Sequence, residues 1–135
     1  MNCYIKEAGS MNTHRHSPLH RSFGYAFQGI FHTVATERNI KIHLFAMVMV
    51  ILFGIWLRLS ATEWFICLIL FGLIISLELV NTAIEAVVDL VTEEKKPLAK
   101  KAKDAAAGAV LFSAIMAAII GLWIFLPKLA AVLAG

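Results

Sequence analysis

The sequence predicts an all-α integral membrane protein in which an amphipathic surface helix precedes three transmembrane helices. Of its 135 residues, 60% are hydrophobic and only 16% are charged, against about half and a quarter in an average soluble domain. The apolar residues form runs long enough to cross a bilayer. Lysine and arginine, by contrast, cluster beside two of these runs. At this length we expect one domain at most.

The first part of the chain is polar, and we expect residues 1–18 to be disordered. From 19 to 35 the apolar residues Phe23, Phe27 and Ile30 recur at helical spacing, opposite polar positions. This pattern is typical of a helix that lies in the headgroup layer of a membrane. A soluble helix packed on a partner is the alternative, which the apolar runs that follow disfavour.

The next two apolar runs predict spans at 40–58 and 63–92. The first is rich in Phe, Met, Val and Ile and closes with Trp56, a residue type that anchors at the interface. Ser60 or Thr62 is placed to cap the second. Because the second run exceeds the roughly 20 residues that cross a bilayer, its acidic end is expected to reach the membrane surface.

A hydrophilic connector is predicted from 93 to 103, with Pro97 as its breaker. The third span is predicted at 104–126 and begins with small residues that let helix backbones approach closely. It ends before a Pro-Lys pair, which leaves residues 129–135 as a C-terminal tail. We therefore expect residues 19–128 to form one membrane domain.

The placement of lysine and arginine predicts the orientation. Five of these residues lie in the N-terminal region through Lys41 and five in the connector, whereas the turn at Arg58 and the C-terminal end at Lys128 carry one each. Cytoplasmic loops carry the excess of positive charge. The N-terminus and the connector are therefore expected in the cytoplasm, and the protein in the cytoplasmic membrane.

Cysteine and histidine give no sign of a metal centre. The two cysteines lie in different environments and form no zinc-binding pattern. Four of the five histidines lie outside the apolar runs, so we interpret the histidines as solvated or interfacial. We expect no nucleic-acid partner.

The second span carries three acids and an asparagine on one face. At 100° per residue, Glu85 and Asp89 fall about 20° to either side of Glu78, and Asn81 about 60° away. A carboxylate at membrane depth costs roughly 2.5–3.5 kcal/mol even on insertion scales, so it is retained where it faces protein, ions or substrate. This face is therefore a candidate functional site.

Carboxylates beside a lysine-rich connector can form a phosphoryl-transfer site. Mg²⁺ takes one or two protein carboxylates together with substrate phosphates, and lysines neutralise phosphate charge. Glu78 is the deepest acid and is expected to act as general base on an alcohol. Glu85 and Asp89 suit metal or phosphate-side roles, and Glu37, before the first span, can complete the metal site. The chain has neither a P-loop nor a kinase-type glycine-rich loop.

Structural roles stay open for the same residues. The acids can instead pair with connector lysines, Asp89 above all. Glu93 and Glu94 can be solvated loop charges. Glu37 can belong to a helix cap with a surface salt bridge.

The pattern ExxNxAIExxxD from Glu78 to Asp89, followed by Ala-Lys-Asp at 102–104, closely resembles the prokaryotic diacylglycerol kinase family of small membrane lipid kinases. The resemblance covers residues 19–128. The stretch 96–110 is similar to the Gram-positive branch, which is associated with undecaprenol kinase activity. The resemblance implies a homotrimer with active sites shared between subunits, and MgATP as phosphoryl donor.

The resemblance also implies roles for individual residues. Glu78 matches the catalytic base that accepts the lipid hydroxyl proton, and Glu37 and Glu85 match the metal-binding acids. Asn81 and Asp89 match positions that organise the site. Nucleotide contacts are implied for a set drawn from all parts of the chain: Tyr25, Glu37, Glu85, Glu94, Lys95, Lys96, Lys103 and Asp104.

Three functions follow as hypotheses. The leading one is ATP- and Mg²⁺-dependent phosphorylation of undecaprenol to undecaprenyl phosphate. The same chemistry on diacylglycerol, giving phosphatidic acid, is the alternative, because both lipids present a hydroxyl at headgroup level. A hypothesis of another class is a non-catalytic ion-conducting or scaffolding oligomer lined by the acidic face.

Overall fold

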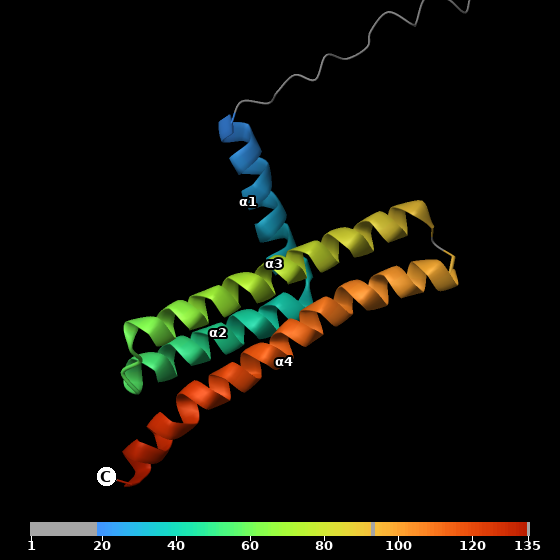
Figure 1. The fold of residues 1–135 in the computed structure, drawn as a ribbon. Helices are drawn as coiled ribbons and strands as arrows, with labels where there is room; N and C mark the ends of the chain where they lie inside the picture. The colour runs from blue at the N-terminus through green and yellow to red at the C-terminus, as the bar shows by residue number, and fades with distance from the viewer. Residues whose placement is uncertain (1–18, 93, 135) are drawn as a thin grey trace, which may run out of the picture.

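The computed structural model describes residues 19–92 and 94–134, and these form four helices (Figure 1). They are α1 (Leu19–Thr36), α2 (Arg38–Trp56), α3 (Ala61–Val91) and α4 (Pro97–Ala134). The expectation of a disordered segment at 1–18 and the interpretation of Glu93 lie outside the described residues.

The helix α3 is the centre of the arrangement. It runs antiparallel to α4 over most of its length and packs against α2 with its first part (Figure 1). The far end of α3 and the beginning of α4 continue past the start of α2 as a two-helix hairpin, while α1 leaves the bundle at a steep angle near that start. The start of α2 therefore lies beside the middle of α3.

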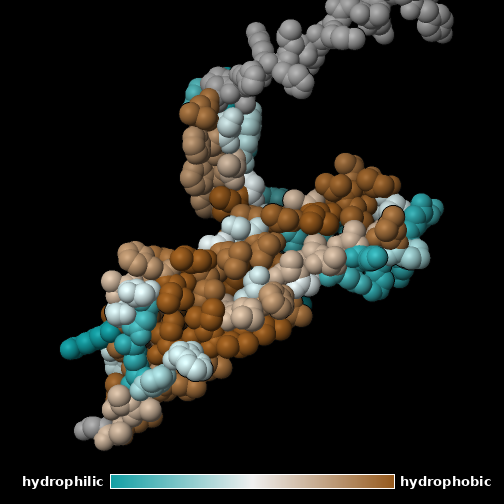
Figure 2. All heavy atoms as spheres, in the orientation of Figure 1, coloured by the Kyte–Doolittle hydropathy of each residue, from teal (hydrophilic) through white to brown (hydrophobic). Residues whose placement is uncertain are grey.

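The predicted all-α membrane protein is confirmed by the helices themselves. The helices α2, α3 and α4 are each long and apolar enough to cross a membrane. On the face seen in Figure 2, hydrophobic residues cover the middle of the bundle, whereas hydrophilic residues gather at its two ends, one of which is the hairpin tip between α3 and α4. The helix at 19–35 is also found, one residue longer, as α1. Its position on a membrane surface stays a prediction.

The turn between α2 and α3 is built as the capping rule requires. The Ser60 hydroxyl accepts a hydrogen bond from the Glu63 amide, and the Glu63 carboxylate accepts one from the Ser60 amide, which completes a capping box. Arg58 closes the turn in the left-handed conformation, with φ of 54°. Its neighbours Leu57 and Leu59 are buried in one apolar cluster. Of the two predicted caps, Ser60 is the one used.

The last helix is longer than the predicted third span at both ends. The expected connector at 93–103 becomes helical at Pro97, because proline is favoured in the first turn, where its missing N–H costs nothing. Beyond the expected end of the span at 126, α4 continues through Pro127 to Ala134, and the place where the chain leaves the membrane stays a prediction. Beyond that proline, Lys128 lies 3.1 Å from the Glu63 carboxylate on α3. This contact fastens the last part of α4 to the beginning of α3.

Candidate active site

The predicted polar face of α3 is turned inward where it meets α2 and α4. Glu78 is 2% exposed and Asn81 is 7% exposed, so both polar residues are buried between the helices. Thr82 donates a hydrogen bond from its hydroxyl to the Glu78 carbonyl, which satisfies this hydroxyl within the helix. The helical spacing thus places the acid and the amide in the interior, as expected.

Three helices enclose a small polar pocket of about 200 Å³ at this point. Helix α3 contributes the predicted residues Glu78, Asn81 and Glu85. The start of α2 contributes two polar side chains and one aliphatic side chain, and α4 contributes small and aliphatic side chains. The lining from these two helices is Asn39, Ile42, His43, Ala107, Val110, Leu111 and Ala114. The small residues predicted to admit close helix packing at the start of the third span include Ala107, which lines this pocket.

Asn81 links the two acids along α3. Its amide nitrogen Nδ2 donates a 3.0 Å hydrogen bond to Oε1 of Glu85. Its amide oxygen Oδ1 is buried and accepts no hydrogen bond within residues 19–92 and 94–134. An unpaired buried acceptor is costly, so this oxygen is suited to a ligand that supplies a donor or a cation.

His43 was missed by the sequence interpretation and is part of the site. Its Nε2 lies 3.2 Å from Oε1 of Glu78, although the contact lacks the geometry of a hydrogen bond and Oε1 has no such partner in the described chain. The signal that could have found it is its place as the single histidine inside an apolar run. The correction is that this histidine lies within α2 and faces Glu78, and so does not belong to a solvated tail.

Glu37 lies at the junction of α1 and α2, next to the pocket. It is the residue before the first turn of α2, but its side chain makes no capping hydrogen bond. The alternative of a cap formed by this carboxylate is therefore not supported. Its charge and that of Glu85 both act on the Glu78 carboxyl. The assignment of Glu37 and Glu85 as metal ligands and of Glu78 as the base stays a prediction.

The remaining predicted residues lie apart from the pocket, mostly at the hairpin tip. Lys103 on α4 pairs with Asp89 on α3 at 2.6 Å, and Lys100 pairs with Asp104 within α4. The structural alternative for Asp89, pairing with a connector lysine, is thus seen. Lys96 lies 3.4 Å from Glu94 on the surface. Lys95 is exposed, and so is Tyr25, far along the chain on α1.

The pocket's donor set fits Mg²⁺. Among its lining, the Glu85 carboxylate and the unpaired Asn81 Oδ1 offer oxygen ligands, and oxygen is the ligand that Mg²⁺ prefers. Residues 19–92 and 94–134 hold no group of three or more His, Cys, Asp or Glu arranged around a single metal position.

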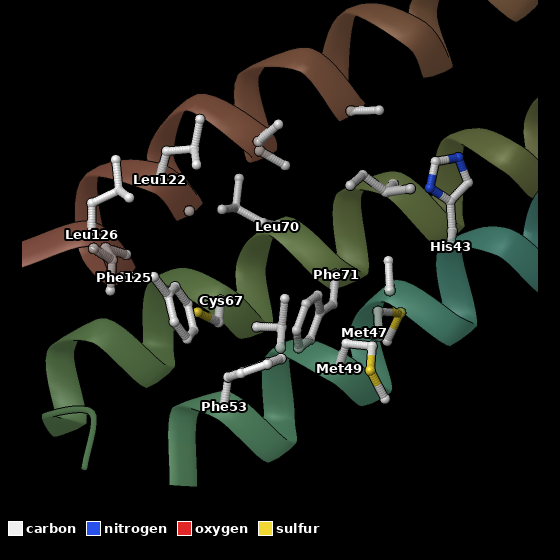
Figure 3. A pocket seen from close by; sticks show the side chains of 18 of the residues that line it. His43, Met47, Met49, Phe53, Cys67, Leu70, Phe71, Leu122, Phe125 and Leu126 are labelled. Atoms are coloured by element: carbon white, nitrogen blue, oxygen red, sulfur yellow. The ribbon is translucent and has the colours of Figure 1, made fainter. Parts of the chain in front are cut away.

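A larger apolar cavity of about 610 Å³ adjoins the polar pocket. It lies between α2 and α4 over the face of α3, with His43 at one end and Phe125 and Leu126 at the other (Figure 3). Its lining is almost wholly aliphatic, aromatic or sulfur-containing. His43 and Ala114 line both the cavity and the polar pocket, so the two spaces meet there.

Comparison with known proteins gives consistent matches. Residues 24–125 match the family described as prokaryotic diacylglycerol kinase. The chain is 53% identical to undecaprenol kinase of Bacillus subtilis over 109 residues, which cover 81% of this chain and 89% of the relative. It is 47% identical to diacylglycerol kinase of Synechocystis over 109 residues, 80% of this chain and 62% of that protein. Identity to diacylglycerol kinase of Escherichia coli is 30% over 108 residues, 80% and 88% of the two chains.

Proposed function

Because the chain belongs to the prokaryotic diacylglycerol kinase family and is a membrane lipid kinase, we propose that it transfers the γ-phosphoryl group of ATP to the hydroxyl of undecaprenol. The proposal of undecaprenol over diacylglycerol is supported by the 53% identity to the Bacillus subtilis enzyme of that name, against 47% and 30% for two relatives named for diacylglycerol. The family also implies ATP as the phosphoryl donor.

One observation carries the substrate class: the polar pocket that holds Glu78 joins the apolar cavity at His43 and Ala114. A lipid alcohol has matching parts, a hydroxyl at one end and hydrocarbon behind it. With the hydroxyl at Glu78, the hydrocarbon nearest to it enters the apolar cavity, where it loses no hydrogen bonds. A water-soluble alcohol has no hydrocarbon chain to contact the apolar side chains that line the cavity.

The reaction assigns a proton path to Glu78. Its carboxylate accepts the proton of the lipid hydroxyl as the alcohol oxygen forms a bond to the γ-phosphorus of ATP. The bond from that phosphorus to the bridging oxygen of the β-phosphate breaks, and ADP leaves. Burial of Glu78 excludes bulk water from the acceptor, which favours transfer to the lipid over hydrolysis.

Other residues hold the phosphate end. Glu37 and Glu85 would bind Mg²⁺, which would neutralise the charge of the ATP phosphates. Asn81 holds Glu85 in position through its 3.0 Å hydrogen bond. Lys103, in turn, is held by Asp89 at the membrane-surface end of the hairpin. The remaining predicted nucleotide contacts, Tyr25, Glu94, Lys95, Lys96 and Asp104, join them in this proposal.

We also propose a homotrimer with shared sites, with the N-terminus and the α3–α4 connection in the cytoplasm. Two features support it. Tyr25 is exposed on α1 and distant along the chain from the pocket, so a neighbouring subunit is a natural place for its contact. The lysine-rich hairpin tip lies at the end of α3 toward which the acidic face leads, where the positive-inside rule places the cytoplasm.

A lipid panel tests the proposed function. Purified protein in mixed micelles receives undecaprenol or diacylglycerol at equal mole fraction, with radiolabelled ATP and Mg²⁺, and the labelled lipid is measured. We expect turnover of undecaprenol to exceed that of diacylglycerol. A preference for diacylglycerol would show that diacylglycerol, and not undecaprenol, is the substrate. Ion flux in liposomes with no labelled lipid would favour the non-catalytic ion-conducting oligomer.

A further inference from the structure

His43 is the side chain on α2 that reaches the buried carboxylate of α3. Its Nε2 lies 3.2 Å from Oε1 of Glu78. Glu78 is only 2% exposed, and its Oε1 accepts no hydrogen bond from the described chain. The contact crosses between two helices, so it depends on how α2 and α3 are placed relative to each other.

A buried carboxylate without donors is not held in one orientation. The free energy of burying such a group is unfavourable unless a partner compensates it, and the other charges in this region make it worse. Glu37 and Glu85 are both acidic and both act on Glu78. The imidazole of His43 lies beside Oε1 and can donate a hydrogen bond to it without adding negative charge.

The position of His43 also connects it with the acceptor. It lines the polar pocket and the apolar cavity, at the place where the two meet (Figure 3). A lipid hydroxyl that reaches Glu78 from the cavity must pass the imidazole. The side chain is 22% exposed, which leaves one side of the ring open to the cavity while Nε2 faces the carboxylate.

We propose that His43 is a positioning residue for the catalytic base. A small rotation brings its Nε2–H into line with Oε1 of Glu78, and this hydrogen bond turns the other carboxylate oxygen toward the incoming lipid hydroxyl. The proton of the alcohol passes to that second oxygen, and His43 neither gains nor loses a proton. This inference rests on the proposed function, because it presupposes that Glu78 takes the hydroxyl proton.

The test compares two substitutions that differ in one donor. His43→Leu fills similar space without an N–H group, whereas His43→Gln retains an amide N–H near the place of Nε2. Misplacing a catalytic group by about 1 Å costs roughly 10²-fold in rate, so we expect kcat of the Leu variant to fall about 10- to 100-fold. The KM for ATP should change little, and His43→Gln should recover most of the lost kcat. His32→Leu, on the exposed surface of α1, is the matched control and should keep the wild-type rate.

A double variant separates positioning from a structural role. If His43 acts through Glu78, adding His43→Leu to Glu78→Gln lowers kcat no further, whereas a general loss of structure lowers it again and also lowers Tm. The inference is overturned by an unchanged kcat in His43→Leu, by equal losses in the Leu and Gln variants, or by an additional loss in the double variant. If wild type and His32→Leu phosphorylate no lipid alcohol, the proposed function fails instead.

Discussion

Replacing Glu78 with glutamine removes the negative charge and the proton acceptor and keeps the shape of the side chain. The carboxylate is buried at 2% exposure, and its Oε1 contacts His43 without a hydrogen bond. The amide can occupy the same pocket but cannot accept the proton of the lipid hydroxyl. Nucleotide and metal ligands assigned to other residues remain in place.

The size of the effect on catalysis follows from the role of a general base. Such a base contributes about 10²- to 10⁴-fold, so kcat of Glu78→Gln should fall by that range, equivalent to about 2.7–5.4 kcal/mol in the activation barrier at 1.36 kcal/mol per tenfold. The KM for ATP should change less than about threefold, because the residue contacts the acceptor and not the nucleotide.

The same substitution should not destabilise the fold. A charged side chain at membrane depth is unfavourable by roughly 2.5–3.5 kcal/mol on insertion scales, and glutamine avoids that cost and relieves repulsion from Glu37 and Glu85. We expect the Tm of the variant to equal or exceed that of wild type. A fall in kcat together with a retained Tm identifies a functional residue whose charge the fold does not need.

Steady-state kinetics with radiolabelled ATP and thermal unfolding in one detergent measure both quantities. The matched control is Glu63→Gln, the same change in the first turn of the same helix. The Glu63 carboxylate contacts Ser60 and Lys128, away from the polar pocket. This control should keep kcat and lose some stability, the reverse of Glu78→Gln. Turnover within about twofold of wild type in Glu78→Gln, against the 10²-fold expected, refutes the assignment of the base.

Three further predictions test the surroundings of the site. Glu85→Gln should raise the Mg²⁺ concentration for half-maximal activity by about tenfold or more, and an unaltered Mg²⁺ requirement means that Glu85 is no ligand. The pair of Lys103 with Asp89 is half exposed, so a double-mutant cycle on unfolding should give a coupling of about 0.2–1 kcal/mol; a value of several kcal/mol contradicts this. Gly54→Ala should lower stability by about 1–3 kcal/mol, because its Cβ would come 2.8 Å from the indole ring on α3. Gly72→Ala, with nothing within 4 Å, is its control, and equal Tm values for the two alanine variants would show that the contact relaxes freely.

Much of the fold could be predicted because membrane insertion depends on composition over a long window. The three spanning helices follow from uncharged runs, and the cap at Ser60 follows from a local hydrogen-bonding rule. The length of α4 could not be predicted this way. Proline and lysine are local stop signals, but the first turn of a helix accepts Pro97, and Pro127 lies within a helix that the Lys128–Glu63 contact fastens to α3.

The candidate site likewise has a part that a local rule predicts and a part that depends on helix packing. The inward face of α3 follows from a rotation of 100° per residue, and that rule correctly brought Glu78, Asn81 and Glu85 into one pocket. His43 was missed because a single polar residue in an apolar run forms no repeating pattern. Its contact with Glu78 depends on how α2 is rotated relative to α3. That relation belongs to packing and not to either helix alone.

The most direct test of the account follows the γ-phosphate. Purified protein in mixed micelles with undecaprenol, Mg²⁺ and γ-labelled ATP should yield labelled undecaprenyl phosphate, and the Glu78→Gln protein, equally folded, should yield at most about a hundredth as much in the same time. Equal labelling by the two proteins, or no labelled lipid alcohol from the wild type, would contradict it.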